Sequence, residues 1–301
     1  MGYDIIILGH ISKDIIVEFQ GGESRLLGGA LVYSAITAAA AGAKVLAITK
    51  AAKEDIPALD FMKSRGNLRL MAIESPASTS ILNVFTSEDR ERREVTLLSS
   101  AQPFAPRDIP LDAQAPLYYL AGLFVGELPD TLIGDFYGKA KIAIDAQGLL
   151  RAALPDKTMK FFDWKEKARY LPMVDYFKTD AAEAEILTGL SDRREAAKAL
   201  ADIGRRDDGS APEIMVTHNT EVLVLAGGEF FAAPFTPSNL SGRTGRGDTT
   251  FSSYLAWRKD HGPREAVRFA AALCSIKMEK PGPFSGSLKD VFVRMERDSP
   301  R

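Results

Sequence analysis

The amino-acid sequence predicts an α/β protein of three layers, with helices on both faces of a mostly parallel central sheet and with a small additional β-sheet. Two observations lead to this fold class. Short runs of consecutive apolar residues alternate with segments of helical periodicity, which is typical of strands buried on both faces between helices. Near residues 12–28 and 78–99 this alternation breaks, because strand-like stretches follow one another with no room for a helix.

The elements of the large sheet follow in chain order. The apolar run over residues 4–9 predicts a first buried strand, followed by a helix of small residues over 30–42 and a strand over 44–49. Glycine at the end of that helix is a common C-terminal signal. Further strands are predicted over residues 68–73, 117–121, 141–145, 174–178 and 213–217, and further helices over 181–187 and 193–203.

The remaining strands predict the small sheet. Residues 14–19 follow the first strand directly, and residues 79–85 and 93–98 have the pattern of an antiparallel hairpin. We expect these strands to form a sheet that projects from the large one as a lid. The alternative is that they extend the large sheet as edge strands.

The length of 301 residues fits one large α/β domain or two modest ones, and we expect a single domain over residues 1–301. Hydrophobic residues make up 46% of the chain and charged residues 26%, which excludes wholesale disorder. The 38 basic and 40 acidic residues give a formal net charge of -2, so the chain has no general basic surface for nucleic acid or for a membrane. We therefore expect neither a nucleic-acid partner nor a membrane partner.

Compartment and membrane signals agree with this expectation. Cys274 is the single cysteine and forms no internal disulfide, which favours a reducing cytoplasm. The most apolar stretch, residues 30–43, is shorter than the roughly 20 apolar residues that a membrane-spanning helix needs. The sequence thus predicts a cytoplasmic protein without a membrane span.

A glycine-rich loop carries the strongest chemical signal. Residues 238–250 lead directly into a helical pattern near Phe251, so the loop ends at a helix N-terminus. The free N–H groups and the partial positive charge of such a terminus bind anions. Gly245 and Gly247 let a phosphate approach the backbone closely, and we therefore predict a phosphate-binding loop here.

Asp248 is an unusual residue in an anion site, because its carboxylate repels an anion. General-base chemistry would explain it: Asp248 would accept the proton of a hydroxyl group that attacks the phosphate. The simpler alternative is that Asp248 only caps the helix. The chain has neither a Gly-x-x-x-x-Gly-Lys-[Ser/Thr] loop nor a Gly-x-Gly-x-x-Gly loop after its first strand, which disfavours P-loop NTPases and nicotinamide oxidoreductases.

Several landmarks, in order, resemble the ribokinase-like (PfkB) family of carbohydrate and nucleoside kinases. Residues 244–248 resemble the C-terminal signature of this family, and residues 27–30 with the following small-residue helix resemble its N-terminal Gly-Gly signature. Asp14 matches the family aspartate that holds acceptor hydroxyls, and residues 180–183 resemble the Asn-x-x-Glu motif. The resemblance covers nearly the whole chain.

The resemblance implies a ribokinase-like fold and transfer of the γ-phosphoryl group of ATP to an alcohol of a sugar or nucleoside. Asp248 would be the general base, and the N–H groups around Gly245, Arg246 and Gly247 would form the anion hole. Glu183 would support Mg²⁺ indirectly, through water. The small sheet would close over the acceptor and keep water away from ATP.

The resemblance also implies where the two substrates bind. The acceptor would be held by Asp14, Gly28, Gly29, Gln147 and Arg151, the last two in a loop that resembles an Asp-Pro-Gln-Gly-x-x-Arg stretch of sugar, inositol and nucleoside kinases. Arg151 equally fits a surface arginine when only its own residue type is considered. The nucleotide would lie against Thr217, Thr244, Gly245, Gly247, Lys277 and Gly282.

Three departures from the family pattern are evident. Gly242 and Arg243 replace the first two residues of the common Asp-Thr-x-Gly-Ala-Gly-Asp form, so the sequence does not support the family's monovalent-cation site. Arg246 replaces an alanine and either adds positive charge near the phosphates or points to solvent. Asp180 replaces the usual asparagine.

These departures motivate a second hypothesis, a sensor that binds a sugar or nucleoside without catalysis. The acceptor stays open among nucleosides, inositol, ribose, fructose and other sugars. An exposed apolar strand at the edge of the lid can pair with a second subunit, so a homodimer through the lid is a further expectation.

Overall fold

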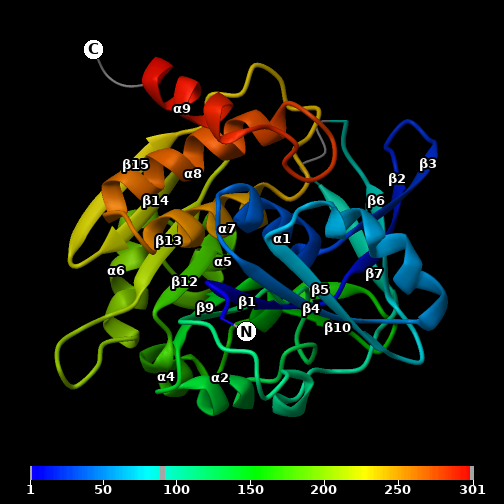
Figure 1. The fold of residues 1–301 in the computed structure, drawn as a ribbon, viewed down its shortest axis with the longest axis horizontal. Coiled ribbons are helices and arrows are strands. Elements are labelled where there is room, and N and C mark those ends of the chain that lie inside the picture. Colours follow the sequence, from blue (N-terminus) through cyan, green and yellow to red (C-terminus); the bar gives the residue numbers. More distant parts are fainter. Residues whose placement is uncertain (1, 89–91, 299–301) are drawn as a thin grey trace.

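A nine-stranded sheet forms the centre of the molecule in the computed structural model, which describes residues 2–88 and 92–298 (Figure 1). Neighbouring strands are parallel from β13 through to β5, and β14 and β15 are antiparallel at one edge. The mostly parallel sheet that the sequence predicts is therefore confirmed. In spatial order the strands are β15 (Glu229–Pro234), β14 (Glu221–Ala226), β13 (Glu213–Thr217), β12 (Tyr176–Asp180), β9 (Lys141–Asp145), β8 (Leu117–Leu120), β1 (Ile5–Leu8), β4 (Val45–Ala51) and β5 (Leu68–Glu74).

Helices cover both faces of this sheet, and each face has its own apolar core. The three layers form because strands such as β1 are buried on both sides and need apolar cover on both. One face carries α1 (Ala30–Ala40), α7 (Arg246–Arg258) and α8 (Pro263–Met278), with α9 (Leu288–Arg297) packed on α8. The other carries α2 (Thr131–Phe136), α3 (Gln147–Leu150), α4 (Lys167–Tyr170), α5 (Ala181–Thr188) and α6 (Arg193–Ile203).

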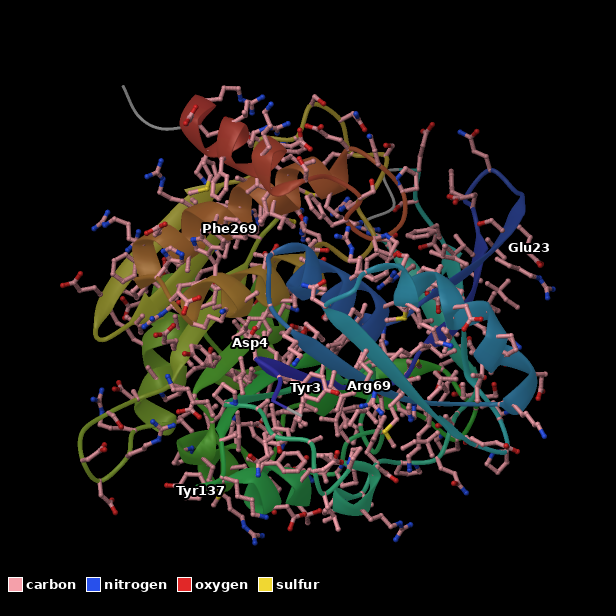
Figure 2. The ribbon with its side chains drawn as sticks, viewed as in Figure 1. Tyr3, Asp4, Glu23, Arg69, Tyr137 and Phe269 are labelled. Atoms are coloured by element: carbon pink, nitrogen blue, oxygen red, sulfur yellow. The ribbon has the colours of Figure 1, made fainter. Side chains whose placement is uncertain are left out.

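The lid is a separate four-stranded sheet, so the alternative of extra edge strands is wrong. Its order is β3 (Glu23–Gly28), β2 (Ser12–Val17), β6 (Thr79–Phe85) and β7 (Arg93–Ser99). Figure 2 shows Glu23 at the outer end of this sheet, away from the helices of the main body. Pairing of a lid edge with a second subunit remains a prediction.

His10 connects the root of the lid to the large sheet. It is fully buried, and its Nδ1 lies 2.9 Å from the hydroxyl oxygen of Thr79, where β6 begins. The backbone N–H of His10 donates to Oε1 of Glu127 at 2.6 Å. These contacts fix the point where the chain leaves β1 and enters the lid, directly above the carboxyl ends of the large sheet.

Some smaller elements were not predicted. They are the β14–β15 hairpin, the short pair β10 (Arg151–Ala153) and β11 (Met159–Phe161), and the 3₁₀ segments η1 (Lys53–Ser64), η2 (Pro106–Asp108) and η3 (Leu171–Met173). Among the described residues, no helix has the length and apolar character needed to cross a lipid bilayer.

Candidate active site

A cavity of about 420 Å³ lies where the lid meets the carboxyl ends of β9, β12 and β13. This is the edge at which open α/β sheets bind ligands. The cavity wall contains most of the residues that the sequence analysis singled out: Asp14, Gly29, Gln147, Arg151, Glu183, Thr217, Thr244, Gly245, Arg246, Gly247 and Asp248. The tertiary structure therefore brings together segments that are far apart in the sequence.

The loop predicted to bind phosphate ends at the N-terminus of α7, where the sequence predicts a helix start. Gly245 is the N-cap residue and has φ 79°, a left-handed conformation that favours glycine. A Cβ atom there would also lie 2.3 Å from the ring of Tyr33, so no other residue fits. The N–H of Arg246 donates to the carbonyl of Arg243 at 3.3 Å, which leaves the amides of Gly247 and Asp248 best placed for an anion.

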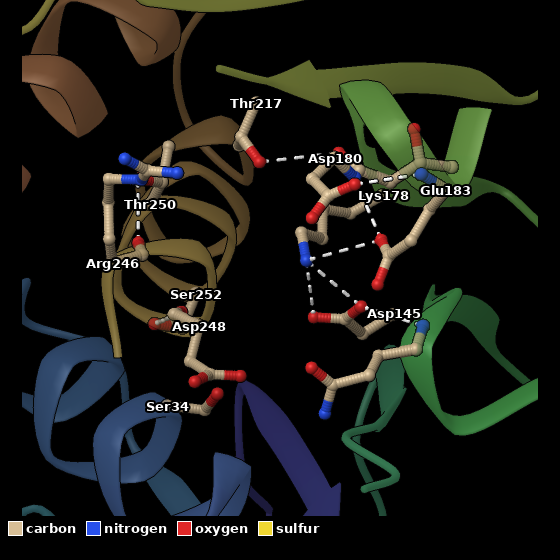
Figure 3. Close-up of polar contacts among 12 residues, drawn as sticks. Ser34, Asp145, Lys178, Asp180, Glu183, Thr217, Arg246, Asp248, Thr250 and Ser252 are labelled. Carbon is tan, nitrogen blue, oxygen red and sulfur yellow. Dashed lines mark hydrogen bonds and ion pairs between the residues drawn. The ribbon is translucent and has the colours of Figure 1, made fainter. Parts of the chain in front are cut away.

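Asp248 stands in the first turn of α7, and its carboxyl group faces the cavity opposite Asp145 and Lys178 (Figure 3). Burial and the nearby Asp145 raise its pKa, Lys178, Lys277 and Arg151 lower it, and the result is a pKa of about 6. A carboxylate with this pKa is ionised at neutral pH and still basic enough to accept a proton. The environment of Asp248 thus suits the predicted general base better than a simple helix cap.

Lys178 on β12 lies between two buried carboxylates, that of Asp145 at the end of β9 and that of Glu183 on α5. Its Nζ donates to both carboxylate oxygens of Asp145 at 3.0 Å and lies 3.9 Å from Oε2 of Glu183. Glu183 accepts from the N–H of Asp180 at 2.8 Å, and Asp180 accepts from the N–H of Glu183 at 2.8 Å, which caps α5. Burial raises the pKa of Glu183 to about 8, against the lowering effect of Lys178.

The acceptor end of the cavity lies under the lid. Asp14 on β2 accepts a hydrogen bond from the hydroxyl of Ser12, and burial raises its pKa, while Ser12, Arg151 and Arg93 lower it. Arg151 is 5% exposed and donates from Nε to the carbonyl of Leu123 at 2.8 Å, so it is a buried cation and no surface arginine. Burial lowers the pKa of Arg151 to about 10.

Two further acceptor residues were predicted on the same side. Gln147 begins α3, where its N–H donates to Oδ1 of Asp145 at 3.1 Å, and its side chain lines the cavity. Gly28 is buried behind the wall, and a Cβ built there would approach Tyr33 at 3.5 Å and Asp14 at 3.8 Å. Asp14, Gln147 and Arg151 together present hydrogen-bond donors and acceptors to one small volume.

Lys277 and Gly282, two of the predicted nucleotide residues, lie outside the cavity wall. Lys277 is buried under the loop, where its Nζ donates to the carbonyl oxygens of Gly242 and Thr244. Burial lowers the pKa of Lys277 to about 8. In this structure Lys277 supports the phosphate-binding loop from behind.

Gly242 explains one departure from the family pattern. A Cβ atom at this position would lie 1.8 Å from the backbone carbonyl oxygen of Lys280. The loop therefore packs so closely against the end of α8 that an aspartate side chain has no space. This close packing is a physical reason why the loop lacks the acidic residue of the common family form.

Two arginines meet at the donor side of the cavity. Arg246 Nη1 and Arg243 Nη2 both donate to Oδ1 of Asn219, at 2.9 Å and 3.1 Å. Asn219 follows β13, and all three residues line the cavity. Of the two alternatives for Arg246, the one that places positive charge near the phosphate loop agrees with this position.

The sequence analysis missed Asp145, Lys178, Tyr33 and Asn219 as site residues. A signal existed for two of them: Lys178 is a lysine within an otherwise buried strand, and Asp145 ends another buried strand. Charged side chains at such positions are rare unless they are paired. Tyr33 and Asn219 carried no comparable signal.

The described residues contain no group of three or more histidine, cysteine, aspartate or glutamate side chains arranged to hold a metal ion. The carboxylate oxygens of Asp145 are taken by Lys178, and Oε2 of Glu183 is taken by the N–H of Asp180. These residues therefore fit no direct metal cage. A through-water role of Glu183 toward Mg²⁺ stays a prediction.

The three-layer α/β fold with its lid sheet, and the cavity between the lid and the glycine-rich loop, are the features expected from the resemblance to carbohydrate and nucleoside kinases. Residues 21–290 match the pfkB family of carbohydrate kinases. The chain belongs to this family.

Individual relatives differ in donor and acceptor. A pyrophosphate-dependent kinase in the ribokinase family, solved with a pyrophosphate analog and myo-inositol, is 34% identical, with a TM-score of 0.86, over 96% of this chain and 99% of its own. A cytidine kinase from Thermococcus kodakarensis is 25% identical over 94% of this chain and 98% of its own. Ribokinase from Arabidopsis thaliana, complexed with ribose and ATP, is 15% identical with a TM-score of 0.73, covers 98% of this chain and 99% of its own, and shares the fold.

Proposed function

We propose that this chain transfers a phosphoryl group from pyrophosphate to a hydroxyl group of a cyclitol such as myo-inositol. The observation that carries the proposal is the polarity of the donor end of the cavity. Its wall consists of Thr217, Asn219, Arg243, Thr244 and Arg246, beside Lys178. The apolar lining residues lie elsewhere: Ile16, Ile81 and Phe85 on the lid strands, Ala30 and Tyr33 on α1, and Leu123 after β8.

This distribution favours a compact, highly charged donor over a nucleotide. Binding sites for a ring such as adenine are usually walled by apolar or aromatic side chains, and none of the described residues named here as the donor wall is of that kind. Arginine guanidinium groups bind phosphate oxygens through paired, charge-assisted hydrogen bonds. The solved pyrophosphate-dependent relative supports the same donor, whereas the sequence resemblance led to ATP.

The acceptor end suits a molecule with hydroxyl groups on all sides. Asp14 can accept hydrogen bonds from two hydroxyls, and Arg151 and Gln147 can donate to others. The relative solved with myo-inositol supports a cyclitol, and the cytidine kinase supports a nucleoside as the competing acceptor.

In the proposed reaction, Asp248 accepts the proton of the acceptor hydroxyl group. At the same time the oxygen of that hydroxyl group forms a bond to one phosphorus atom of pyrophosphate. The bridging P–O bond breaks, and orthophosphate leaves with the electron pair. The amides at the start of α7 bind the oxygens of the transferring group, and the lid excludes water. Mg²⁺, when bound with the donor, would neutralise phosphate charge, and Glu183 would hold its water shell.

The test is a donor and acceptor panel. Purified protein is incubated with myo-inositol, cytidine or ribose, each with pyrophosphate or with ATP, and phosphorylated products are followed by ³¹P NMR. We expect turnover with pyrophosphate and myo-inositol. Turnover with ATP alone overturns the proposed donor, and binding of an acceptor without turnover by either donor favours the sensor hypothesis.

Replacement of Arg246 by glutamine tests the donor end directly. We expect the KM for the donor to rise about 10- to 100-fold, because a charge-assisted hydrogen bond to phosphate contributes roughly 1.5–3 kcal/mol. The KM for the acceptor should change little. The matched control is Arg169→Gln on α4, where the arginine side chain is 69% exposed and pairs with Glu166. An unchanged donor KM in Arg246→Gln contradicts the assignment.

A further inference from the structure

Lys178 is a buried cation that has no role in the proposed reaction. It lies on β12, is 5% exposed, and extends toward the cavity between Asp145 and Glu183 (Figure 3). Removing a charge from water is costly even when the charge is paired. Such a residue is expected to have either a partner that requires it or a ligand that uses it.

The partners of Lys178 use only part of its hydrogen-bonding capacity. An ammonium group has three N–H donors, and Asp145 accepts from two of them at 3.0 Å. Oε2 of Glu183, at 3.9 Å, is beyond hydrogen-bond distance. Lys178 lines the cavity, so a bound ligand can accept the remaining N–H.

The ammonium group also lies beside the phosphate-binding loop. A Cβ atom built on Gly247 would lie 3.0 Å from Nζ and 3.3 Å from Cε of Lys178. An oxygen that accepts the N–H of Gly247 or Asp248 is therefore within reach of Nζ. The absence of a side chain at position 247 leaves space for the lysine at the point where the helix terminus binds an anion.

The side chain of Lys178 keeps its positive charge. Burial alone would lower its pKa, but Asp145, Glu183, Asp180 and Asp248 surround it, and together they hold its pKa above the usual range. The group therefore stays protonated throughout the working range of the enzyme.

We infer that Lys178 is a catalytic residue whose ammonium group binds the transferring phosphoryl group, with Asp145 as the positioning residue that aims it. The inference rests on the phosphoryl transfer of the family and holds for pyrophosphate and for ATP alike. The lysine supplies a fixed positive charge opposite the amides of α7. Charge that develops on the equatorial oxygens of the transferring group is then stabilised from two sides.

The competing explanation is that Lys178 only neutralises the buried carboxylates around it. The two explanations separate in a pair of variants. Lys178→Met removes the cation but leaves Asp145 without its partner, which destabilises the fold. The double variant Lys178→Met with Asp145→Asn removes both charges together and should recover most of the melting temperature. Asp145→Asn alone keeps the cation and serves as the matched control.

The experiment measures three quantities for each variant, with the donor that the wild-type enzyme turns over: the melting temperature, its shift with added pyrophosphate, and kcat at neutral pH and at about pH 9. The higher pH keeps Asp248 ionised after Lys178 is lost, because Lys178 lowers the pKa of Asp248. We expect the double variant to fold, to lose the pyrophosphate shift, and to retain a kcat about 10²–10³-fold below wild type at both pH values. Asp145→Asn should lose less than about tenfold.

Recovery of kcat in the double variant overturns the inference, because a purely structural lysine would no longer be needed. An unchanged pyrophosphate shift in that variant does the same. A wild-type enzyme that uses ATP and not pyrophosphate would refute the proposed donor without touching the role of Lys178, which is then measured with ATP and its own thermal shift.

Discussion

Replacing Asp248 with asparagine is expected to lower kcat by about 10³–10⁴-fold, because general-base catalysis contributes roughly 10²–10⁴-fold and the substituted amide cannot accept the proton. Asparagine keeps the shape of the side chain, so donor and acceptor binding should persist. Single-turnover kinetics with a calorimetric binding measurement separate the two effects. Retention of full turnover would contradict the role of Asp248 as the base.

The pH dependence of the wild-type enzyme gives a second measurement of the same residue. Burial raises the pKa of Asp248 to about 6, and the base is active only when it is ionised. We therefore expect kcat to fall below about pH 6, roughly tenfold for each further pH unit. A profile that is flat down to pH 5 would exclude a carboxyl group with this pKa as the base.

The Asp248→Asn substitution should also stabilise the protein. A carboxyl group whose pKa is raised in the folded state, from 3.8 to about 6, favours folding fully below about pH 4, and that contribution is lost as the pH rises through 6. At pH 7 the ionised Asp248 therefore opposes folding, and Asp248→Asn should gain between about 1 and 3 kcal/mol. Urea unfolding of both proteins at pH 5 and pH 8 measures the gain, which should be larger at pH 8.

Replacing Gly245 with alanine is expected to remove most of the activity by a different route. The residue has φ 79° and caps α7, and its added Cβ atom would lie 2.3 Å from the Tyr33 ring. The left-handed conformation costs about 1–2 kcal/mol and the overpacking about 1–3 kcal/mol. The loop must move to relieve the contact, so the amides lose their alignment and kcat should fall about 10²–10³-fold.

Gly189→Ala is the matched control for this substitution. Gly189 ends α5 with φ 73°, and a Cβ atom there would have no neighbour within 4 Å. This variant should therefore show only the cost of the left-handed conformation, with a lower melting temperature and normal kcat. Equal kinetic losses in the two variants would mean that general destabilisation, and not displacement of the loop, lowers the activity.

Much of the large sheet could be predicted because its strands have a local signature. The strands over 141–145 and 213–217 and the helix over 193–203 lie where the apolar pattern places them. The strand predicted over 174–178 is observed at Tyr176–Asp180, because its polar end still pairs with β13 inside the sheet. The β14–β15 hairpin was missed, although apolar runs on either side of Gly227 and Gly228 are typical of a hairpin.

The lid shows where local pattern stops being sufficient. β3 contains a glutamate, a serine and an arginine before its first leucine, so its sequence has no clear strand alternation. It is a strand because β2 lies beside it and pairs with it along its whole length. Cross-strand hydrogen bonds of this kind depend on a partner, and the residues of one segment do not specify that partner.

The same distinction between local sequence pattern and tertiary contact applies to the site. The sequence by itself determined that a glycine-rich loop with an aspartate leads into a helix N-terminus, because glycines, a helix start and one acidic residue are contiguous and act through local backbone geometry. Only the tertiary structure decided that Lys178 lies against Asp145, that Lys277 supports the loop from behind, and that Arg243 and Arg246 both donate to Asn219. These contacts join residues that the order of strands in the sheet brings together, and that order depends on the packing of the whole chain.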